Sequence, residues 1–186
     1  MVSGADFCYL TPMEELKYPV GKFTLDKGVT PGKRAAWISE LAGLPVALRR
    51  AVQGFSKEQL DTPYREGGWS ARQLVHHLAD SHMNTLIRFK LCLTENEPAV
   101  KPFDQDKWAV TADVLEIEPH VSLGILDGVH VRLVALLRSL QPADFKRAFK
   151  HPERGLMDLD HTLQLYAWHG RHHLAQITEL RRRQDW

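Results

Sequence analysis

Four long stretches of the sequence repeat their apolar residues every three or four positions. They run from about residue 33 to 55, from 70 to 96, from 122 to 140 and from 158 to 183. This spacing is the period of a helix that buries one face, and no convincing series of alternating residues indicates strands. Four helices joined by loops predict an all-α fold, a four-helix bundle.

Signals at the helix ends support these boundaries. Ser70 followed by Gln73 has the form of a capping box, so the second helix is expected to start there. Asp158 or Asp160 would cap the fourth helix. Pro45 lies inside the first stretch, where its missing N–H is expected to bend or split the helix.

The segments outside the four stretches divide the chain. Residues 1–32 contain prolines and glycines with no sustained period, which predicts an irregular N-terminal arm. Residues 98–120 form a long connection with a short helical turn around Trp108, and residues 145–159 predict a small hairpin before the last helix. A chain of 186 residues suits one core, so we expect the arm to precede a single helical bundle domain over 33–186.

Composition excludes several classes of partner. The net charge of +1 gives no basic excess for nucleic acid, and the basic run Arg181–Arg183 falls at a helix C-terminus, where cations are favoured. The first twenty residues lack an apolar block, and no later run reaches about 18 uninterrupted apolar residues, so we expect no membrane segment. Cys8 and Cys92 are too few and too far apart for a disulfide scaffold, which favours the cytoplasm.

Histidines are unusually frequent and are clustered. The second and fourth predicted helices carry seven of the ten: His76, His77, His82, His161, His169, His172 and His173. His169 and His173 are four residues apart, so on a helix both rings point to one side and can share a cation. A wheel at ~100° per residue places both on or beside the apolar stripe, with His172 towards the polar side.

A pair of histidines at this spacing has two explanations. Both rings could bind a metal ion, or both could be core histidines with hydrogen-bond partners. A catalytic zinc usually takes three protein ligands, so a metal site needs one more. On the second helix the wheel places His82 near the middle of the apolar face, His77 at its flank and His76 furthest away, and a lone histidine such as His82 is commonly a core residue.

Two segments carry a resemblance to a known family. They are LDTPYREGGWSARQLVHHLADSHMNTLIRFKL at residues 60–91 and LYAWHGRHHLAQITEL at residues 165–180. Over nearly its whole length the chain resembles the DinB/YfiT-type metal-dependent hydrolases. The resemblance implies a DinB-type four-helix bundle, a homodimer, and a metal held by His77, His169 and His173. It also implies a relation to enzymes that transfer low-molecular-weight thiols, such as bacillithiol, onto electrophiles.

The expected cofactor is one divalent transition metal per chain, with zinc or nickel favoured by imidazole ligands. Such an ion lowers the pKa of water towards 7, which predicts hydrolysis of a small-molecule substrate. It could instead stabilise a thiolate, so a thiol S-transferase is the alternative, and a non-enzymatic metal-binding bundle is a third. Asp80, one helical turn from His77, is the candidate catalytic base; it could also orient a ligand or be a solvated acid.

Overall fold

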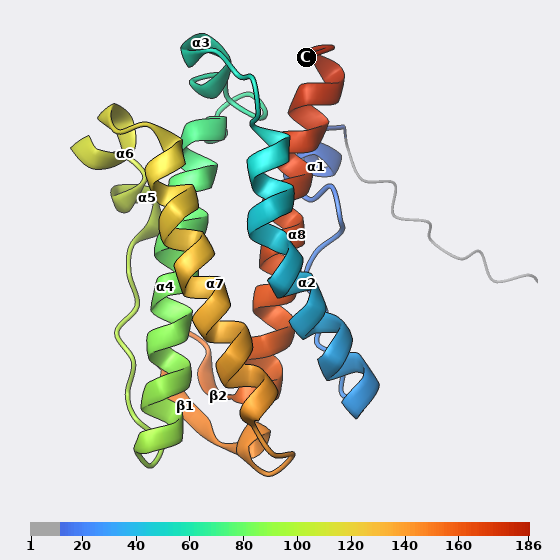
Figure 1. The fold of residues 1–186 in the computed structure, drawn as a ribbon, viewed down its shortest axis with the longest axis vertical. Coiled ribbons are helices and arrows are strands. Elements are labelled where there is room, and N and C mark those ends of the chain that lie inside the picture. Colours follow the sequence, from blue (N-terminus) through green and yellow to red (C-terminus); the bar gives the residue numbers. More distant parts are fainter. Residues whose placement is uncertain (1–11) are drawn as a thin grey trace, which may run out of the picture.

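The structure is a computed structural model that describes residues 12–186, so Cys8 and the tip of the predicted arm lie outside it. Four long helices lie side by side in Figure 1. They are α2 (Pro31–Ala51), α4 (Ala71–Thr94), α7 (Pro119–Ser139) and α8 (Leu159–Arg183). The predicted all-α four-helix bundle is confirmed, with each helix close to its expected stretch.

Short elements fill the connections. They are α1 (Pro12–Lys17), α3 (Lys57–Leu60), α5 (Gln105–Trp108), α6 (Ala112–Glu116), a 3-10 helix η1 (Asp144–Lys146), β1 (Ala148–His151) and β2 (Gly155–Asp158). The two strands pair antiparallel with Ala148 opposite Asp158, which confirms the predicted hairpin. The helical turn at Trp108 is also confirmed, and the described part of the predicted irregular arm contains the short helix α1.

The predicted caps are largely present. Ser70 accepts a hydrogen bond from the backbone N–H of Gln73 (3.2 Å), and the Gln73 side chain accepts one from the backbone N–H of Ser70 (2.8 Å). Asp158 caps α8 by accepting from the backbone N–H of His161 (2.7 Å). Asp160, the alternative cap, is not one, because its carboxylate pairs with Arg34 at 2.6 Å.

Pro45 does not split α2, and the carbonyl that loses its usual hydrogen-bond donor receives another one. The helix is continuous from Pro31 to Ala51. A proline lacks the N–H that would bond the carbonyl four residues earlier, which here is Leu41 O. His130 on α7 donates to that carbonyl from Nδ1 at 2.6 Å. A side chain from a neighbouring helix therefore replaces the bond that the proline removes.

The apolar core is divided into two clusters by a polar layer. One cluster includes Phe89 and Leu159, and the other includes Leu48 and Leu74. Along the helices the division falls between Leu78 and Leu86 on α4, between Leu126 and Leu133 on α7, and between Tyr166 and Ile177 on α8. Buried histidines occupy these intervals. The middle level of the bundle therefore contains buried polar groups, each of which needs a hydrogen-bond partner.

Helix α7 is the long apolar helix of the bundle. Among the described residues it is the one helix whose length and mean hydropathy (1.4 over an 18-residue window) would allow it to cross a membrane. It packs between α2 and α4, where Leu126 and Leu133 are fully buried. Core helices of water-soluble proteins meet the same criteria, and 44% of this window is buried inside the bundle.

The segment before α2 lies along α8. Trp168 Nε1 donates to Gly21 O (3.1 Å), and the Asp26 N–H donates to the Gln164 side chain (2.9 Å). Close packing holds α8 against α2 as well, because a Cβ on Gly170 would lie 2.6 Å from Leu44 Cδ2. These contacts thus fix the helix that carries His161, His169, His172 and His173.

Candidate metal centre

Three ring nitrogens from two helices meet at one place in the polar layer. His77 comes from α4, and His169 and His173 come from α8. His169 Nε2 lies 3.1 Å from His77 Nε2 and 3.2 Å from His173 Nε2. Nitrogens that share a tetrahedral zinc at about 2.0–2.1 Å each lie about 3.3 Å apart. The three residues predicted as ligands are therefore brought together at a spacing that fits one ion.

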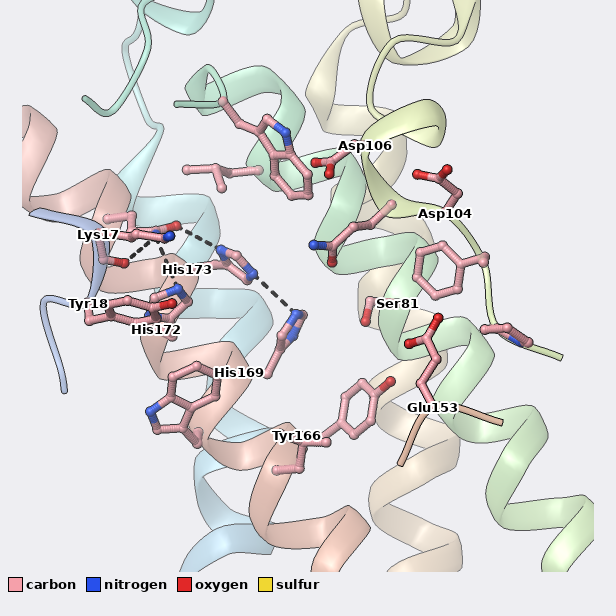
Figure 2. Close-up of a pocket in the computed structure, with 18 of the residues that line it drawn as sticks. Lys17, Tyr18, Ser81, Asp104, Asp106, Glu153, Tyr166, His169, His172 and His173 are labelled. Carbon is pink, nitrogen blue, oxygen red and sulfur yellow. Dashed lines mark hydrogen bonds between the residues drawn. The ribbon is translucent and has the colours of Figure 1, made fainter. Parts of the chain in front are cut away.

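The group has no further ligand within residues 12–186. No fourth His, Cys, Asp or Glu offers an atom to it. Structural zinc sites are normally closed by four protein ligands, whereas catalytic sites use three and leave a position for an exchangeable ligand. His169 and His173 also line a cavity of about 1020 Å³, and Figure 2 shows them along one side of it. The arrangement is that of an open site.

Burial keeps the three imidazoles neutral. It lowers the pKa of His77 to about 4, and it holds the pKa values of His169 and His173 well below the ordinary value of 6.5. For all three the loss of solvation is the largest cause, and neighbouring histidines add to it. Neutral imidazole is the form that binds a metal, so the site is ready for an ion at neutral pH.

The tautomer of His173 is set by an amide. Its Nδ1 donates to Gln176 Oε1 at 2.8 Å, which leaves the lone pair of Nε2 for a metal. The Gln176 amide nitrogen donates to Lys17 O and to His172 Nε2, both at 3.0 Å. The orientation of this ligand thus depends on the backbone of the segment that precedes α2.

The tautomer of His169 is set by a chain of histidines that we call the relay, formed by His169, His82 and His130. His169 Nδ1 lies 3.3 Å from His82 Nε2, and His82 Nδ1 lies 2.9 Å from His130 Nε2. The relay ends at Leu41 O, which can only accept, so His130 donates from Nδ1. In neutral rings His130 Nε2 then accepts from His82 Nδ1–H, and His82 Nε2 accepts from His169 Nδ1–H. This direction leaves the lone pair of His169 Nε2 facing the other two ligands.

The structure also locates the remaining histidines of α4. His82 is fully buried and hydrogen bonded at both nitrogens, which confirms the interpretation of a core residue. His76, expected to point away from the core, is also buried, where its nitrogens contact Ser122 Oγ (2.7 Å) and Ile117 O (3.1 Å). The wheel could not show this, because the start of α7 covers that side of α4.

His172 on α8 is likewise more buried than its position on the wheel predicts. It is 6% exposed, with the Trp168 ring stacked at 4.6 Å and the Tyr18 ring at 5.7 Å. The covering residue Tyr18 belongs to the N-terminal segment, which no helical period describes. Trp69, which the sequence did not single out, lies 4.7 Å from the His77 ring and forms part of the cavity wall.

Asp80 is not among the residues that line the cavity. Burial, followed by the charge of Asp113, raises the pKa of its carboxyl to about 6. The structure gives no contact between this carboxyl and the three ligands, so its role as a base stays a prediction. The elevated pKa follows from the burial of Asp80 on α4 and from Asp113 on α6 rather than from any group in the cavity.

Comparisons with known proteins agree with the geometry. The sequence profile described as the DinB superfamily matches residues 40–177. A protein of Bacillus mycoides strain KBAB4, provisionally named a metal-dependent hydrolase, is 50% identical over 94% of this chain and 100% of its own length. A protein of Bacillus cereus strain B4264 with the same provisional name is 49% identical over the same shares.

A solved structure shows the same fold. It is YfiT from Bacillus subtilis, described as a probable metal-dependent hydrolase with an unusual four-helix bundle topology. It superposes with a TM-score of 0.90 at 46% sequence identity, covering 92% of this chain and 99% of that chain. Fold and sequence therefore agree along nearly the entire length of both proteins.

Proposed function

The chain belongs to the DinB superfamily, and on that premise we propose that it is a metal-dependent hydrolase of a small-molecule substrate. One observation carries the proposal: three neutral imidazole nitrogens converge beside a cavity with no fourth ligand among the described residues. His77, His169 and His173 would hold the ion. Zinc or nickel suits three imidazoles best, although availability also decides which ion is bound.

A divalent ion held there would supply Lewis acidity, which lowers the pKa of water towards 7 and so provides a nucleophile at neutral pH. The chain's own residues prepare the place for it. The relay and Gln176 fix the tautomers of His169 and His173, and burial keeps the rings uncharged. Trp69 and the other aromatic residues of the wall give the substrate an apolar surface.

A thiol S-transferase is the second candidate, and the size of the cavity favours it. Ligand pockets usually have volumes of about 300–1,000 Å³, so a cavity of about 1020 Å³ has room for a thiol and an electrophile together. A metal-stabilised thiolate would then attack the electrophile. A non-enzymatic bundle is disfavoured, since a site that only stabilises the fold has no use for a large cavity at its ligands.

Product analysis separates the two enzymes. Purified protein is loaded with zinc or nickel and incubated with electrophilic esters and epoxides, with and without a small thiol such as cysteine. Products are identified by mass spectrometry. We expect hydrolysed products without thiol, and turnover that requires thiol would contradict the hydrolase. The His173→Ala variant is the control for chemistry that does not depend on the site.

We also propose that two copies of the chain pair through α4 and α7. These adjacent helices carry exposed apolar side chains, among them Ile87 (51% exposed) and Val131 (72% exposed). Large apolar side chains left in water are typical of surfaces that a partner covers. Sedimentation of the wild type should give a dimer, and Ile87→Asp should shift it to monomer; a wild-type monomer would contradict the pairing.

A further inference from the structure

Arg88 is a buried cation in the wall of the same cavity. Its side chain is on α4, and the residue is 8% exposed. Arg88 makes two long hydrogen bonds with the protein: Nη1 donates to Tyr166 Oη (3.3 Å), and Nη2 donates to Lys101 O (3.4 Å). Both acceptors are neutral, and most of the guanidinium N–H donors have no acceptor within residues 12–186.

Arg88 forms no ion pair with any carboxylate of the described residues. The other buried guanidinium group of the described residues differs. Arg72, 2% exposed, pairs with Asp61 at 2.6 Å, and the partly buried Arg34 pairs with Asp160 through two bonds of 2.6 and 2.8 Å. A buried charge without a counter-ion is strongly destabilising. The chain thus gives the buried Arg72 and the partly buried Arg34 a carboxylate partner and leaves the buried Arg88 without one.

Arg88 is close to the three ligands. Tyr166 accepts from Arg88, and its ring centroid lies 5.6 Å from that of His169. Figure 2 shows Tyr166 and His169 along the same side of the cavity, with the tyrosine hydroxyl directed into it. One tyrosine side chain therefore separates the guanidinium from the candidate metal ligands, and a single small molecule can contact both.

The charge near Arg88 corresponds to one unpaired cation. Glu153 and Arg154 follow one another in the hairpin turn, both are exposed, and their charges offset each other. His151 is buried beside them, and the loss of solvation, followed by the charges of Arg88 and Arg154, lowers its pKa, so it is neutral at pH 7. The net charge of this end of the cavity matches a monoanion, such as a carboxylate, better than a phosphate dianion.

Acidic residues also line the cavity and must be weighed. Asp104 and Asp106 are both exposed, and Asp104 pairs with Lys107 at 3.1 Å. Exposed carboxylates are screened by water, whereas a buried guanidinium is not. Arg88 therefore dominates the field felt by a bound molecule in the buried part of the cavity.

We propose that Arg88 binds a carboxylate group of the substrate, which would accept two parallel N–H bonds from the guanidinium. Aromatic side chains of the wall, including Trp69, Phe103 and Trp168, fit an apolar body attached to that carboxylate. The substrate class is then a small carboxylic acid with an aromatic or apolar body. That its labile bond lies at the three histidines rests on the proposed function, whereas binding at Arg88 does not.

Calorimetric titration with benzoate tests the site, and benzamide, its neutral analogue of the same shape, is the matched ligand. We expect wild-type protein to bind benzoate and not benzamide at constant ionic strength. Arg88→Met should weaken benzoate binding at least roughly tenfold, because a charged hydrogen-bonding pair is lost. Arg88→Lys keeps the charge without the planar fork, and should fall between wild type and Arg88→Met.

Arg65→Met is the control variant, since Arg65 lines the same cavity but is less buried and bonds Tyr64 Oη and Glu66 O. It should bind benzoate as the wild type does. Arg88→Met should also melt no lower than wild type without ligand, because it removes an unpaired buried charge. Should Arg88→Met fail to fold, the Arg88→Lys titration decides the matter alone.

Three outcomes would overturn the proposal: equal binding of benzoate and benzamide, wild-type affinity in both Arg88 variants, or tighter binding of inorganic phosphate than of benzoate at the same site. The same titration on His173→Ala separates this site from the metal. Benzoate binding that survives in that variant supports the Arg88 site even if elemental analysis shows that the wild type holds no metal.

Discussion

Two groups of buried histidines share the polar layer of this bundle, and they differ in one respect. In the pair formed by His82 and His130, every ring nitrogen has a protein partner. In the trio formed by His77, His169 and His173, the Nε2 atom of His169 lies beside those of the other two, and His169 and His173 line the cavity. Residue type is shared by the two groups, so it does not identify a metal site.

The comparison teaches that an uncommitted lone pair is the informative quantity. Burial lowers the pKa values of His82 and His130 as it does those of the trio, so all five rings are neutral. The pair uses its neutral rings to transmit a hydrogen-bond direction, and in the trio His169 and His173 keep the lone pairs of their Nε2 atoms. The hydrogen bonds of the pair therefore fix which nitrogen of His169 carries the lone pair.

The largest expected effect comes from removing a member of the trio. His173→Ala should weaken zinc binding by more than ~100-fold, beyond the loss typical of changing only a ligand's hydrogen-bond partner. Helix content measured by circular dichroism should stay close to wild type, because α8 keeps its other contacts. Elemental analysis after dialysis gives the bound metal. Unchanged metal content would show that the trio does not hold the ion.

A smaller effect is expected from the pair. His82→Leu removes the acceptor for His169 Nδ1–H, so zinc affinity in a competitive chelator titration should fall by about 10–100-fold while the stoichiometry is kept. His76→Leu is the matched control, being a buried histidine of the same helix with no contact to the trio. If both variants lose affinity equally, the relay has no special part in ordering His169.

The pH dependence of stability should count both groups. Their rings have lowered pKa values when folded and about 6.5 when unfolded. The unfolded chain therefore binds more protons below pH 6.5, and stability present above that pH is lost as pH falls. Each such histidine adds up to about 1.4 kcal/mol per pH unit to the slope.

Replacing the pair by leucine in His82→Leu/His130→Leu should make this slope shallower in metal-free protein. Urea unfolding at several values between pH 7 and 5 gives the slope directly. A slope identical to that of the wild type would mean that the two rings are not held neutral in the fold, and the contrast between pair and trio would lose its basis.

The smallest effect concerns Asp80, which lies on α4 between His77 and His82. Burial raises the pKa of its carboxyl from 3.8 to about 6, so ionisation destabilises the folded state above that pH. Asp80→Asn should stabilise the protein by about 1 kcal/mol at pH 8, after allowance for partial exposure, and by nothing below pH 4. Zinc affinity should not change; a large loss would place Asp80 in the chemistry of the trio.

Local signals explain what the sequence could predict. The four helices follow from apolar period, the start of α4 follows from Ser70 and Gln73, and the two candidate ligands of α8 follow from their spacing of four, which also suits a pair of core histidines. His77 was proposed as a ligand by resemblance alone, because the wheel places it at the flank of the apolar face. In the structure α4 and α8 approach each other where His77 and His169 meet, and the ligand roles stay a prediction.

Contacts between distant segments explain what the sequence could not predict. Gln176 gained its role only when the N-terminal segment folded back, since its amide donates to Lys17 O across 159 positions. The burial of His76 depends on the start of α7, and that of His172 depends on Tyr18 in the N-terminal segment. That Arg88 has no counter-ion among the described residues becomes apparent only when every carboxylate around it has been located.

Pro45 gives the relay its polarity. An α-helix of ordinary residues has no carbonyl to spare in its interior, and a histidine arriving from a neighbouring helix would have found Leu41 O already engaged. Pro45 leaves Leu41 O free to accept a hydrogen bond from His130. The N–H protons of His130 and His82 can then be arranged in only one way. The backbone of α2, a helix that supplies no candidate ligand, thus determines which nitrogen of His169 is left for a cation.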